Sequence, residues 1–546
     1  MSTFPTSVST TALDFTWPDG TEVFDGLHLA VGPGRTGLIG LNGSGKSTLL
    51  KLIAGELDPS EGTVKIAGEV GYLPQNVTLD TALKVDEVLG IDATRAALHA
   101  IEAGDASEEN FTAVGDDWDV EERAIALLDQ LGLGHVGLDR TIGEVSGGES
   151  VLLRLAALLL RRPDVLLLDE PTNNLDLYAR RRLYAAVQAW PGVMIVVSHD
   201  RELLDLVDQI AELRSGDVVW YGGNFSAYEE ALAVEQEAAE RMLRVAESDL
   251  KKQKRELTEA HVKLAKRVRY GNKMYAQKRE PKIVMNARKR EAQVSAGKHR
   301  IMHEEKLKEA KERFDEAADA VRDDDEIRVD LPYTAVPPGR RVLSLLDLEL
   351  RYGARVCGGF DLRGPERIAL IGRNGAGKTT LLRTIAGELA PVSGEAVAHV
   401  PLRFLPQRLD VLDGALTVAE NVAKAAPEAT NNRVRARLAR FLFKGARADQ
   451  LAATLSGGER FRAALAALML AEPAPQLLML DEPSNNLDMA SVRQLTDALD
   501  AYEGSLIVAS HDLPFLESAG ITRWLLLDGE LRDIGAEEAR ELMAHG

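Results

Sequence analysis

The sequence has a single cysteine, Cys357, in 546 residues. One thiol excludes an intrachain disulfide and any zinc or iron–sulfur site built from cysteines. Long apolar runs are also missing: no stretch of about 18 apolar residues occurs, and residues 151–160 are interrupted by Arg154. The first ten residues, MSTFPTSVST, lack the basic and apolar regions of a signal peptide. We therefore expect a cytoplasmic protein without membrane spans.

What is present suffices for several folded domains. The 45% of hydrophobic residues can build real cores, and the length of 546 residues predicts three to four domains. Charge is unevenly distributed. Residues 251–300 hold 17 Lys and Arg against 4 Asp and Glu, a net charge of +13. Because the whole chain has a net charge of −20, the residues outside this segment carry −33.

The basic region lies within residues 225–330, which we interpret as a helical hairpin. Its apolar residues recur every seven positions, a spacing that predicts one narrow apolar stripe on each of two helices. These residues are Leu243, Leu250, Leu257 and Leu264, then Leu307, Phe314 and Val321. Arms of roughly 40 residues would be about 60 Å long. Gly271 and Pro281 place the expected turn near residues 267–281.

The charge of this hairpin has two explanations. Most charge runs are solvated helix faces. However, tyrosines and methionines interleave with the basic residues here, and that mixture suits a phosphate backbone and unstacked bases. The RNA contacts that we predict are Arg267, Arg269, Tyr270, Lys273, Tyr275, Lys278, Arg279, Lys282 and Arg288.

A phosphate-binding loop occurs early in the chain. Residues 37–40 read as a strand, residues 49–55 as a helix, and the connection between them matches GxxxxGK[ST]. Glycines let backbone N–H groups surround the β- and γ-phosphates, Lys46 reaches the same phosphates, and Ser47 binds Mg²⁺. The predicted nucleotide contacts are Gly40, Asn42, Gly43, Ser44, Gly45, Lys46, Ser47 and Thr48. Trp17, on an earlier strand, either stacks on adenine or packs against its own small sheet.

Catalytic candidates follow the loop in a fixed order. The buried strand 165–169 ends in two carboxylates, of which Asp169 fits an Mg²⁺ ligand and Glu170 fits the base that orients the attacking water. His199, after the next apolar strand, lies where a γ-phosphate contact belongs, although a lone histidine at a strand end is usually structural. Gln75 and the segment Ser146, Gly147, Gly148 and Glu149 come earlier, between the phosphate loop and the strand 165–169.

The whole series then recurs in the second half of the chain. Its members are Gly372, Asn374, Gly375, Ala376, Gly377, Lys378, Thr379, Thr380, Gln407, Ser456, Gly457, Gly458, Glu459, Asp481, Glu482 and His511. The offset is 332 residues between Lys46 and Lys378 but 310 between Ser146 and Ser456, so the first copy holds 22 extra residues. We read these, including the polar segment 104–119, as an added part of a helical subdomain rather than as a partner contact.

Two such motif sets joined by a basic hairpin resemble the ABC-F family of ribosome-associated ATPases. The resemblance implies an α/β fold with two P-loop ATP-binding-cassette domains, at residues 1–224 and 331–546, joined by an antiparallel helical-hairpin linker at 225–330. The signature motif of this family corresponds to residues 145–149, and Val145 stands where leucine usually begins it. Trp17 stands where tyrosine is common. Neither change removes a phosphate ligand.

The resemblance also implies cofactors and partners. ATP and Mg²⁺ would bind between the cassettes of a monomer, with Lys46 sharing its nucleotide with Ser456, and Lys378 with Ser146. Gln75 and Gln407 would join Ser47, Asp169, Thr379 and Asp481 around Mg²⁺, with Tyr352 as a second adenine contact. The linker would enter the ribosomal E site towards the peptidyl-transferase centre and contact rRNA and tRNA; no DNA contact is expected. The function would be that of a translation factor or of an antibiotic-resistance protein.

Other classes of ATPase fit less well. An ATPase subunit working with separate membrane transporter subunits remains the alternative, but it leaves the basic hairpin without a role. A ribosome-recycling ABC-E protein and the excision-repair cassette ATPase need cysteine clusters that this chain lacks. A chromosome-maintenance ATPase splits one cassette across a longer coiled coil. A scaffold that binds ATP without turnover would not need both Glu170 and Glu482.

Overall fold

The computed structural model describes residues 7–75, 80–173, 175–214, 216–276, 301–318, 331, 333–407, 411–485 and 487–545. Two compact units are present. The cassette unit consists of Met1–Phe225 and Asp325–Gly546, and the linker unit consists of Ser226–Asp324. The cassette unit contains two copies of one α/β architecture, which we call the first and second cassette.

The first cassette contains two β-sheets. Five parallel strands and one antiparallel edge strand form the larger sheet in the order β5-β6-β7-β3-β8-β9, and the smaller antiparallel sheet has the order β2-β1-β4. The strands are β1 (Val8–Thr16), β2 (Glu22–Val31), β3 (Gly34–Gly40), β4 (Glu61–Ile66), β5 (Val70–Leu73), β6 (Val165–Asp169), β7 (Val193–Val197), β8 (Gln209–Arg214) and β9 (Asp217–Gly222).

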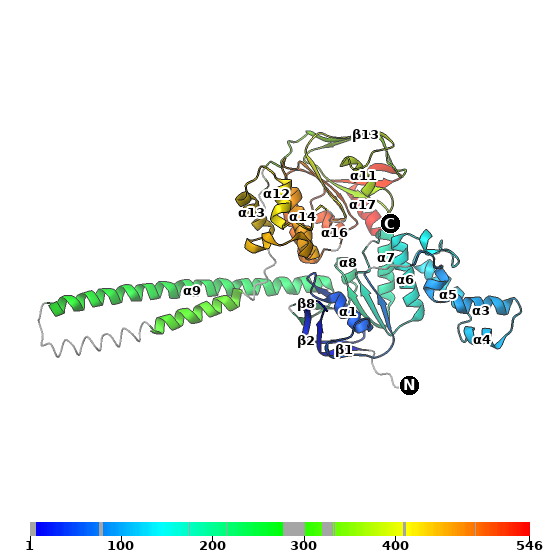
Figure 1. The fold of residues 1–546 in the computed structure, drawn as a ribbon, viewed down its shortest axis with the longest axis horizontal. Coiled ribbons are helices and arrows are strands. Elements are labelled where there is room, and N and C mark those ends of the chain that lie inside the picture. Colours follow the sequence, from blue (N-terminus) through cyan, green and yellow to red (C-terminus); the bar gives the residue numbers. More distant parts are fainter. Residues whose placement is uncertain are drawn as a thin grey trace. The chain divides into compact units, whose positions relative to one another are not determined.

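Helices cover both faces of the larger sheet (Figure 1). The helical segments of the first cassette are α1 (Lys46–Ala54), α2 (Val85–Leu89), α3 (Asp92–Glu102), α4 (Glu108–Val114), α5 (Val120–Gln130), the 3₁₀ turn Ile142–Glu144, α6 (Gly147–Arg161), α7 (Leu177–Ala189) and α8 (Arg201–Leu204). Successive residues of β6 point to opposite faces, so Val165 packs in the core beside α1 while Leu166 packs in the core beside α6. This two-sided burial explains why β6 is a continuous apolar run.

The second cassette joins its strands into one sheet. The nine strands have the order β13-β10-β11-β18-β17-β12-β16-β15-β14, and the pairing of Arg355 with Glu530 connects β11 to β18. The strands are β10 (Arg341–Glu349), β11 (Arg355–Arg363), β12 (Arg367–Ile371), β13 (Ser393–Ala398), β14 (Leu402–Leu405), β15 (Leu477–Asp481), β16 (Ser505–Ala509), β17 (Arg523–Asp528) and β18 (Glu530–Ile534).

The helices of the second cassette repeat the arrangement of the first. They are α11 (Lys378–Ile385), α12 (Val418–Ala425), α13 (Asn431–Leu438), α14 (Gly457–Met469), α15 (Met489–Asp500), α16 (Leu513–Ser518) and α17 (Ala536–His545), with 3₁₀ turns at Ala439–Phe441, Gly445–Asp449 and Ala452–Thr454. In each cassette a glycine-rich loop follows a central parallel strand and opens a helix. Ligand sites in such sheets form at this carboxyl edge of the strands.

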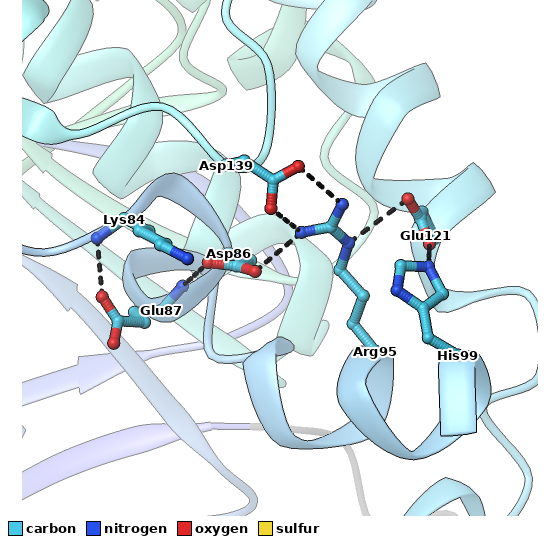
Figure 2. Close-up of polar contacts among 7 residues, drawn as sticks. All are labelled: Lys84, Asp86, Glu87, Arg95, His99, Glu121 and Asp139. Atoms are coloured by element: carbon cyan, nitrogen blue, oxygen red, sulfur yellow. Dashed lines mark hydrogen bonds and ion pairs between the residues drawn. The ribbon is translucent and has the colours of Figure 1, made fainter. Parts of the chain in front are cut away.

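The polar segment 104–119 of the first cassette forms α4 and the connections on either side of it. The neighbouring helix α3 is held by Arg95, whose guanidinium contacts three carboxylates (Figure 2). Its nitrogens lie 2.8 Å from Asp86, 2.7 Å from Asp139 and 3.3 Å from Glu121. Because the Arg95 side chain is only 12% exposed, these contacts are partly shielded from water. Sequence spacing did not reveal this cluster.

The linker unit is helical. α9 (Phe225–Ala276) is 52 residues long, which corresponds to about 78 Å, and residues 301–318 form a second helix that lies beside its middle part (Figure 1). Arg313 of the second helix pairs with Asp249 of α9 at 3.3 Å. Leu250 and Ala310 are the most buried residues of the seam, at 9% and 1% exposure. Of the expected seven-residue stripe, Leu250 is buried, and Leu243, Leu257, Leu307 and Phe314 are half-buried.

One expectation about the linker was wrong in part. The turn was expected near residues 267–281, but residues 267–276 continue α9 as a helix. Residues 277–281 lie outside the described part of the chain. A glycine within a helix costs only about 1 kcal/mol relative to alanine, so it does not end a helix of this length.

Among the described helices, none combines the length and the apolar composition that crossing a membrane requires.

Candidate functional site

The two phosphate loops have the same backbone conformation. Gly40, Gly43 and Gly45 have φ angles of 153°, 84° and 98°, and the equivalent glycines of the second loop have 154°, 80° and 100°. These values favour glycine because a side chain would be strained there. A Cβ at Gly40 would also lie 2.5 Å from the carbonyl oxygen of Leu213. The glycines of the motif therefore give both loops the same turn, which other residues could not adopt without strain.

Each loop encloses a buried lysine that opens the following helix. Lys46 donates to the carbonyl oxygens of Gly40 at 2.8 Å and Leu41 at 2.9 Å. Lys378 donates to the carbonyl of Gly372 at 2.7 Å and to His511 Nε2 at 2.8 Å. Burial lowers the pKa of both lysines. A buried ammonium at this place in a glycine-rich loop can form charge-assisted hydrogen bonds to phosphate oxygens.

The residues predicted to bind Mg²⁺ fit a magnesium site in both cassettes. Ser47 Oγ donates to Asp169 Oδ1 at 3.1 Å, which places a hydroxyl and a carboxylate side by side at the start of α1. In the second cassette, Oδ2 of Asp481 is buried and has no hydrogen-bond partner in the described part of the chain. Such oxygen ligands suit Mg²⁺. Gln75 and Gln407 lie just beyond β5 and β14 and are exposed.

Glu170 and Glu482 occupy the same strained position in the two cassettes. Their φ angles are +49° and +46°, values that residues other than glycine rarely adopt. In both cassettes a histidine lies beside this glutamate. His199 Nε2 lies 3.1 Å from Glu170, and His511 Nε2 lies 3.4 Å from Glu482.

Burial sets the protonation of these pairs. It raises the pKa of Glu170 to about 8 and that of Glu482 to about 7, with the nearby lysine opposing the shift in each site. It lowers the pKa of His199 to about 3, and that of His511 well below its ordinary value. The histidines therefore stay neutral at physiological pH. A glutamate with a pKa near 7 can accept a proton from water, as a general base must.

The signature segments begin two long helices. Ser146 Oγ accepts the N–H of Glu149, whose carboxylate accepts the N–H of Ser146 at 2.8 Å, and Ser456 and Glu459 repeat this capping box at the start of α14. Both serines are exposed. An exposed helix start presents N–H groups and partial positive charge to an anion. Glu149 has a further partner that sequence reasoning missed, His135, at 2.7 Å.

Comparison with known proteins agrees with this arrangement. The family model described as ABC transporter matches residues 24–173 and 359–485. The chain is 30% identical over 538 residues to "Probable ATP-binding protein YheS" of Escherichia coli K12, covering 94% of this chain and 78% of that protein. It is 33% identical over 525 residues to "Tylosin resistance ATP-binding protein TlrC" of Streptomyces fradiae, covering 90% and 92%. This chain belongs to the ABC-F family of ATPases.

Solved structures support the fold. The RNase-L inhibitor matches with a TM-score of 0.59 and 20% identity, covering 97% of this chain and 92% of that one. The archaeal ribosome recycling factor aABCE1 matches with a TM-score of 0.55 and 19% identity, covering 98% and 92%. At these identities the comparison concerns the fold alone. The two regions that match the family model, residues 24–173 and 359–485, lie one in each cassette of this ABC-F ATPase.

The two cassettes of the ABC-F ATPase contact each other through the segments that follow β6 and β15. Asp488 Oδ2 of the second cassette accepts the N–H of Asn42, in the first phosphate loop, at 2.8 Å. In the other direction, the guanidinium of Arg373, in the second phosphate loop, lies 4.6 Å from the ring centre of Tyr178. Asp488 and its counterpart Asp176 follow identical Asn-Asn-Leu sequences. That repeat was the available sequence signal for these contacts.

The structure describes the side chains of both adenine candidates and of three of the RNA candidates. Trp17 is half-buried and packs edge-on against Phe15 at 5.1 Å, as expected if it supports its own sheet, whereas Tyr352 is 77% exposed. On α9, Tyr270 is 68% exposed, and Arg269 and Lys273 are also exposed. The other predicted RNA contacts have side chains outside the described part: Arg267, Tyr275, Lys278, Arg279, Lys282 and Arg288.

Proposed function

We propose that this ATPase acts on the ribosome. In this proposal the linker enters the E site and contacts rRNA and tRNA, and its tip acts near the peptidyl-transferase centre. ATP binding favours closure of the cassettes of a monomer around two Mg²⁺–ATP molecules, and hydrolysis permits release. The task is that of a translation factor or of antibiotic resistance by ribosome protection.

The observation that carries the proposal is the linker helix. α9 is 52 residues long and holds its exposed basic and aromatic residues, Arg269, Tyr270 and Lys273, in its last turns. A helix of about 78 Å exceeds the diameter of a small domain, so its far end can reach a target that the cassettes do not touch. Cationic and aromatic side chains suit phosphates and unstacked bases.

The charge distribution supports the same partner. The chain outside residues 251–300 carries −33, whereas those residues carry +13. An acidic surface opposes nonspecific binding to RNA, and a basic tip then becomes the preferred contact. The relative named for tylosin resistance adds a reason to test drug protection.

The contacts between the cassettes support a shared ATP cycle. Asn42 and Asp488 bond across the two cassettes, and Lys378 is among the residues that feel the charge of Asp176. We therefore expect the nucleotide bound by Lys46 to depend on the second cassette as well as the first. The pairing of each phosphate loop with the opposite signature segment is part of this proposal.

Ribosome cosedimentation tests the proposal. In Glu170→Gln/Glu482→Gln the base is lost while volume and hydrogen bonding are kept, so ATP binds but is not hydrolysed. With ATP, this variant should pellet with ribosomes more strongly than the wild type, and with ADP it should not. Equal pelleting with ATP would contradict the proposed cycle.

A second variant separates the linker from the cassettes. Replacing residues 267–282 with a short Gly-Ser turn, in the same double-Gln background, removes the basic tip but changes no nucleotide motif. Pelleting should weaken and lose part of its salt dependence, because a linker that makes fewer phosphate contacts releases fewer counterions when it binds. ATP binding without ribosomes is the folding control. Undiminished pelleting of this variant would refute the role of the linker. So would undiminished translation and undiminished resistance to a drug panel that includes tylosin when the same replacement is made in the otherwise wild-type chain.

A further inference from the structure

A second basic segment lies in the second cassette, apart from the linker. Residues 431–450 hold six Lys and Arg against one Asp, a net charge of +5, within the part of the chain that carries −33. These residues form α13, two 3₁₀ turns and the connections between them, at the periphery of the second cassette (Figure 1). The segment contains none of the residues assigned to ATP, Mg²⁺ or catalysis.

Four of the six cations carry charge that no carboxylate neutralises. Arg435 Nη1 lies 3.1 Å from Asp449 Oδ2, and Arg437 lies 3.7 Å from Glu472, so these two arginines are paired. The other four are exposed, and among the described residues no carboxylate forms an ion pair with them. They are Arg433, Arg440, Lys444 and Arg447, which we call the α13 surface.

The hydrophobic core holds the α13 surface in place. Each of its four cations is next in sequence to a core residue that is at most 2% exposed. These core residues are Val434, Phe441, Phe443 and Ala448. Because the backbone beside each cation is anchored in a close-packed interior, the four charges are carried by a rigid support. The large apolar side chains of the segment are buried, so the surface presents charge without an apolar anchor.

The first cassette has the same support without the same charges. We align the two with the offset of 310 residues that relates Ser146 to Ser456. The buried residues then correspond, since Ala124, Leu131 and Leu133 take the places of Val434, Phe441 and Phe443. Three of the exposed cations do not correspond, because Gln130, Gly134 and Gly137 take the places of Arg440, Lys444 and Arg447.

The comparison separates the fold of this segment from its charge. Residues 121–140 of the first cassette hold two Arg against four Asp and Glu, a net charge of −2, yet they form a helix on the same buried positions. The subdomain therefore folds without the three extra cations. Their presence in the second cassette points to a partner with negative charge.

We propose that the α13 surface binds the phosphate backbone of RNA and gives the chain a second RNA contact, on the second cassette. The choice of RNA rests on the proposed function. Arginine suits this partner because its guanidinium can donate two parallel N–H bonds to one phosphate. Protein partners usually find aromatic or apolar anchors, which this surface lacks, whereas interfaces with nucleic acids are rich in positive charge.

The test measures binding of the full-length chain to a fluorescent RNA duplex of about 24 base pairs. Arg440→Gln/Lys444→Gln/Arg447→Gln removes three charges, and Gln130 shows that glutamine is tolerated at the first of these places. At about 100 mM salt the affinity should fall roughly tenfold, and the slope of log Kd against log salt should decrease by about two, because three phosphate contacts are lost. The measurement is repeated with residues 267–282 replaced by the Gly-Ser turn, so that binding through the linker does not hide the effect.

Two controls accompany the triple variant. Lys65→Gln/Arg214→Gln/Arg532→Gln removes three exposed cations from the sheets and should leave the affinity and the slope nearly unchanged. Arg440→Lys/Arg447→Lys keeps the charges and should keep most of the binding. Thermal unfolding and basal ATPase activity of the triple variant should match the wild type, because no nucleotide motif is changed.

The outcomes distinguish this proposal from the ribosomal assignment. Unchanged RNA binding by the folded triple variant in both backgrounds, or an equal loss in the sheet control, would overturn it. Unchanged RNA binding together with weaker pelleting with ribosomes would overturn it in favour of an acidic protein partner. Reduced RNA binding would support the α13 surface even if the Glu170→Gln/Glu482→Gln chain failed to pellet with ribosomes, a failure that counts against the proposed function alone.

Discussion

The most direct test of the site concerns the pH at which hydrolysis begins. Burial raises the pKa of Glu170 to about 8 and that of Glu482 to about 7, and either carboxyl can act as a base only when it is ionised. One pH unit below its pKa, a carboxyl is about one-tenth ionised. At pH 7 the free enzyme should therefore have roughly a tenth of its first sites and about half of its second sites ready for proton transfer.

The assay is kcat/KM for ATP at constant ionic strength, because this parameter reports groups of the free enzyme. Glu482→Gln isolates the first site and Glu170→Gln isolates the second. As pH rises from 6 to 8, activity should rise in both, with the midpoint of the first site about one unit higher. His199, with its pKa lowered to about 3, adds no transition in this range.

Two results would refute the reasoning. A midpoint near 4.5, the ordinary value for glutamate, would mean that burial does not control the carboxylate. A higher midpoint for the second site than for the first would mean that the charges around the two sites are assigned wrongly. The double variant Glu170→Gln/Glu482→Gln supplies the background rate, and thermal unfolding at each pH excludes loss of the fold.

Three further predictions address stability and the coupling of the sites. Arg95→Met should destabilise the first cassette by about 3 kcal/mol because it leaves the shielded Asp86 carboxylate without its guanidinium, and amide exchange in α3 should speed up; unchanged exchange would contradict this. Ser456→Arg should weaken the nucleotide held by Lys46 more than that held by Lys378, as site-resolved nucleotide trapping would measure; the reverse order would reject the pairing. Because the folded chain holds a proton on a buried carboxyl that the unfolded chain releases above about pH 4.5, the wild type should lose stability relative to Glu482→Gln as pH rises from 4.5 to about 7. Parallel unfolding curves across that range would show that this carboxyl does not contribute.

Sequence alone determined the parts of the site whose geometry is local. A phosphate loop is built within one strand–loop–helix segment, so Gly40, Lys46 and Ser47 could be assigned from their spacing. The buried strand before Glu170 could be assigned in the same way, because a strand covered on both faces is apolar at every position. The seam of the linker followed from the seven-residue repeat, since the helix period relates spacing to a face.

Only the tertiary structure decided contacts between distant segments and the charges that they create. Asn42 and Asp488 are 446 residues apart, and the repeated Asn-Asn-Leu-Asp sequence does not show which segments meet. The same holds for Arg180 of the first cassette and Asp512 of the second, which line one cavity. The continuation of α9 through Gly271 also escaped the sequence reading, because the small cost of this glycine is outweighed by the many helical bonds on either side. The pKa values of Glu170 and Glu482 depend on burial, which the packing of whole domains sets and residue spacing does not.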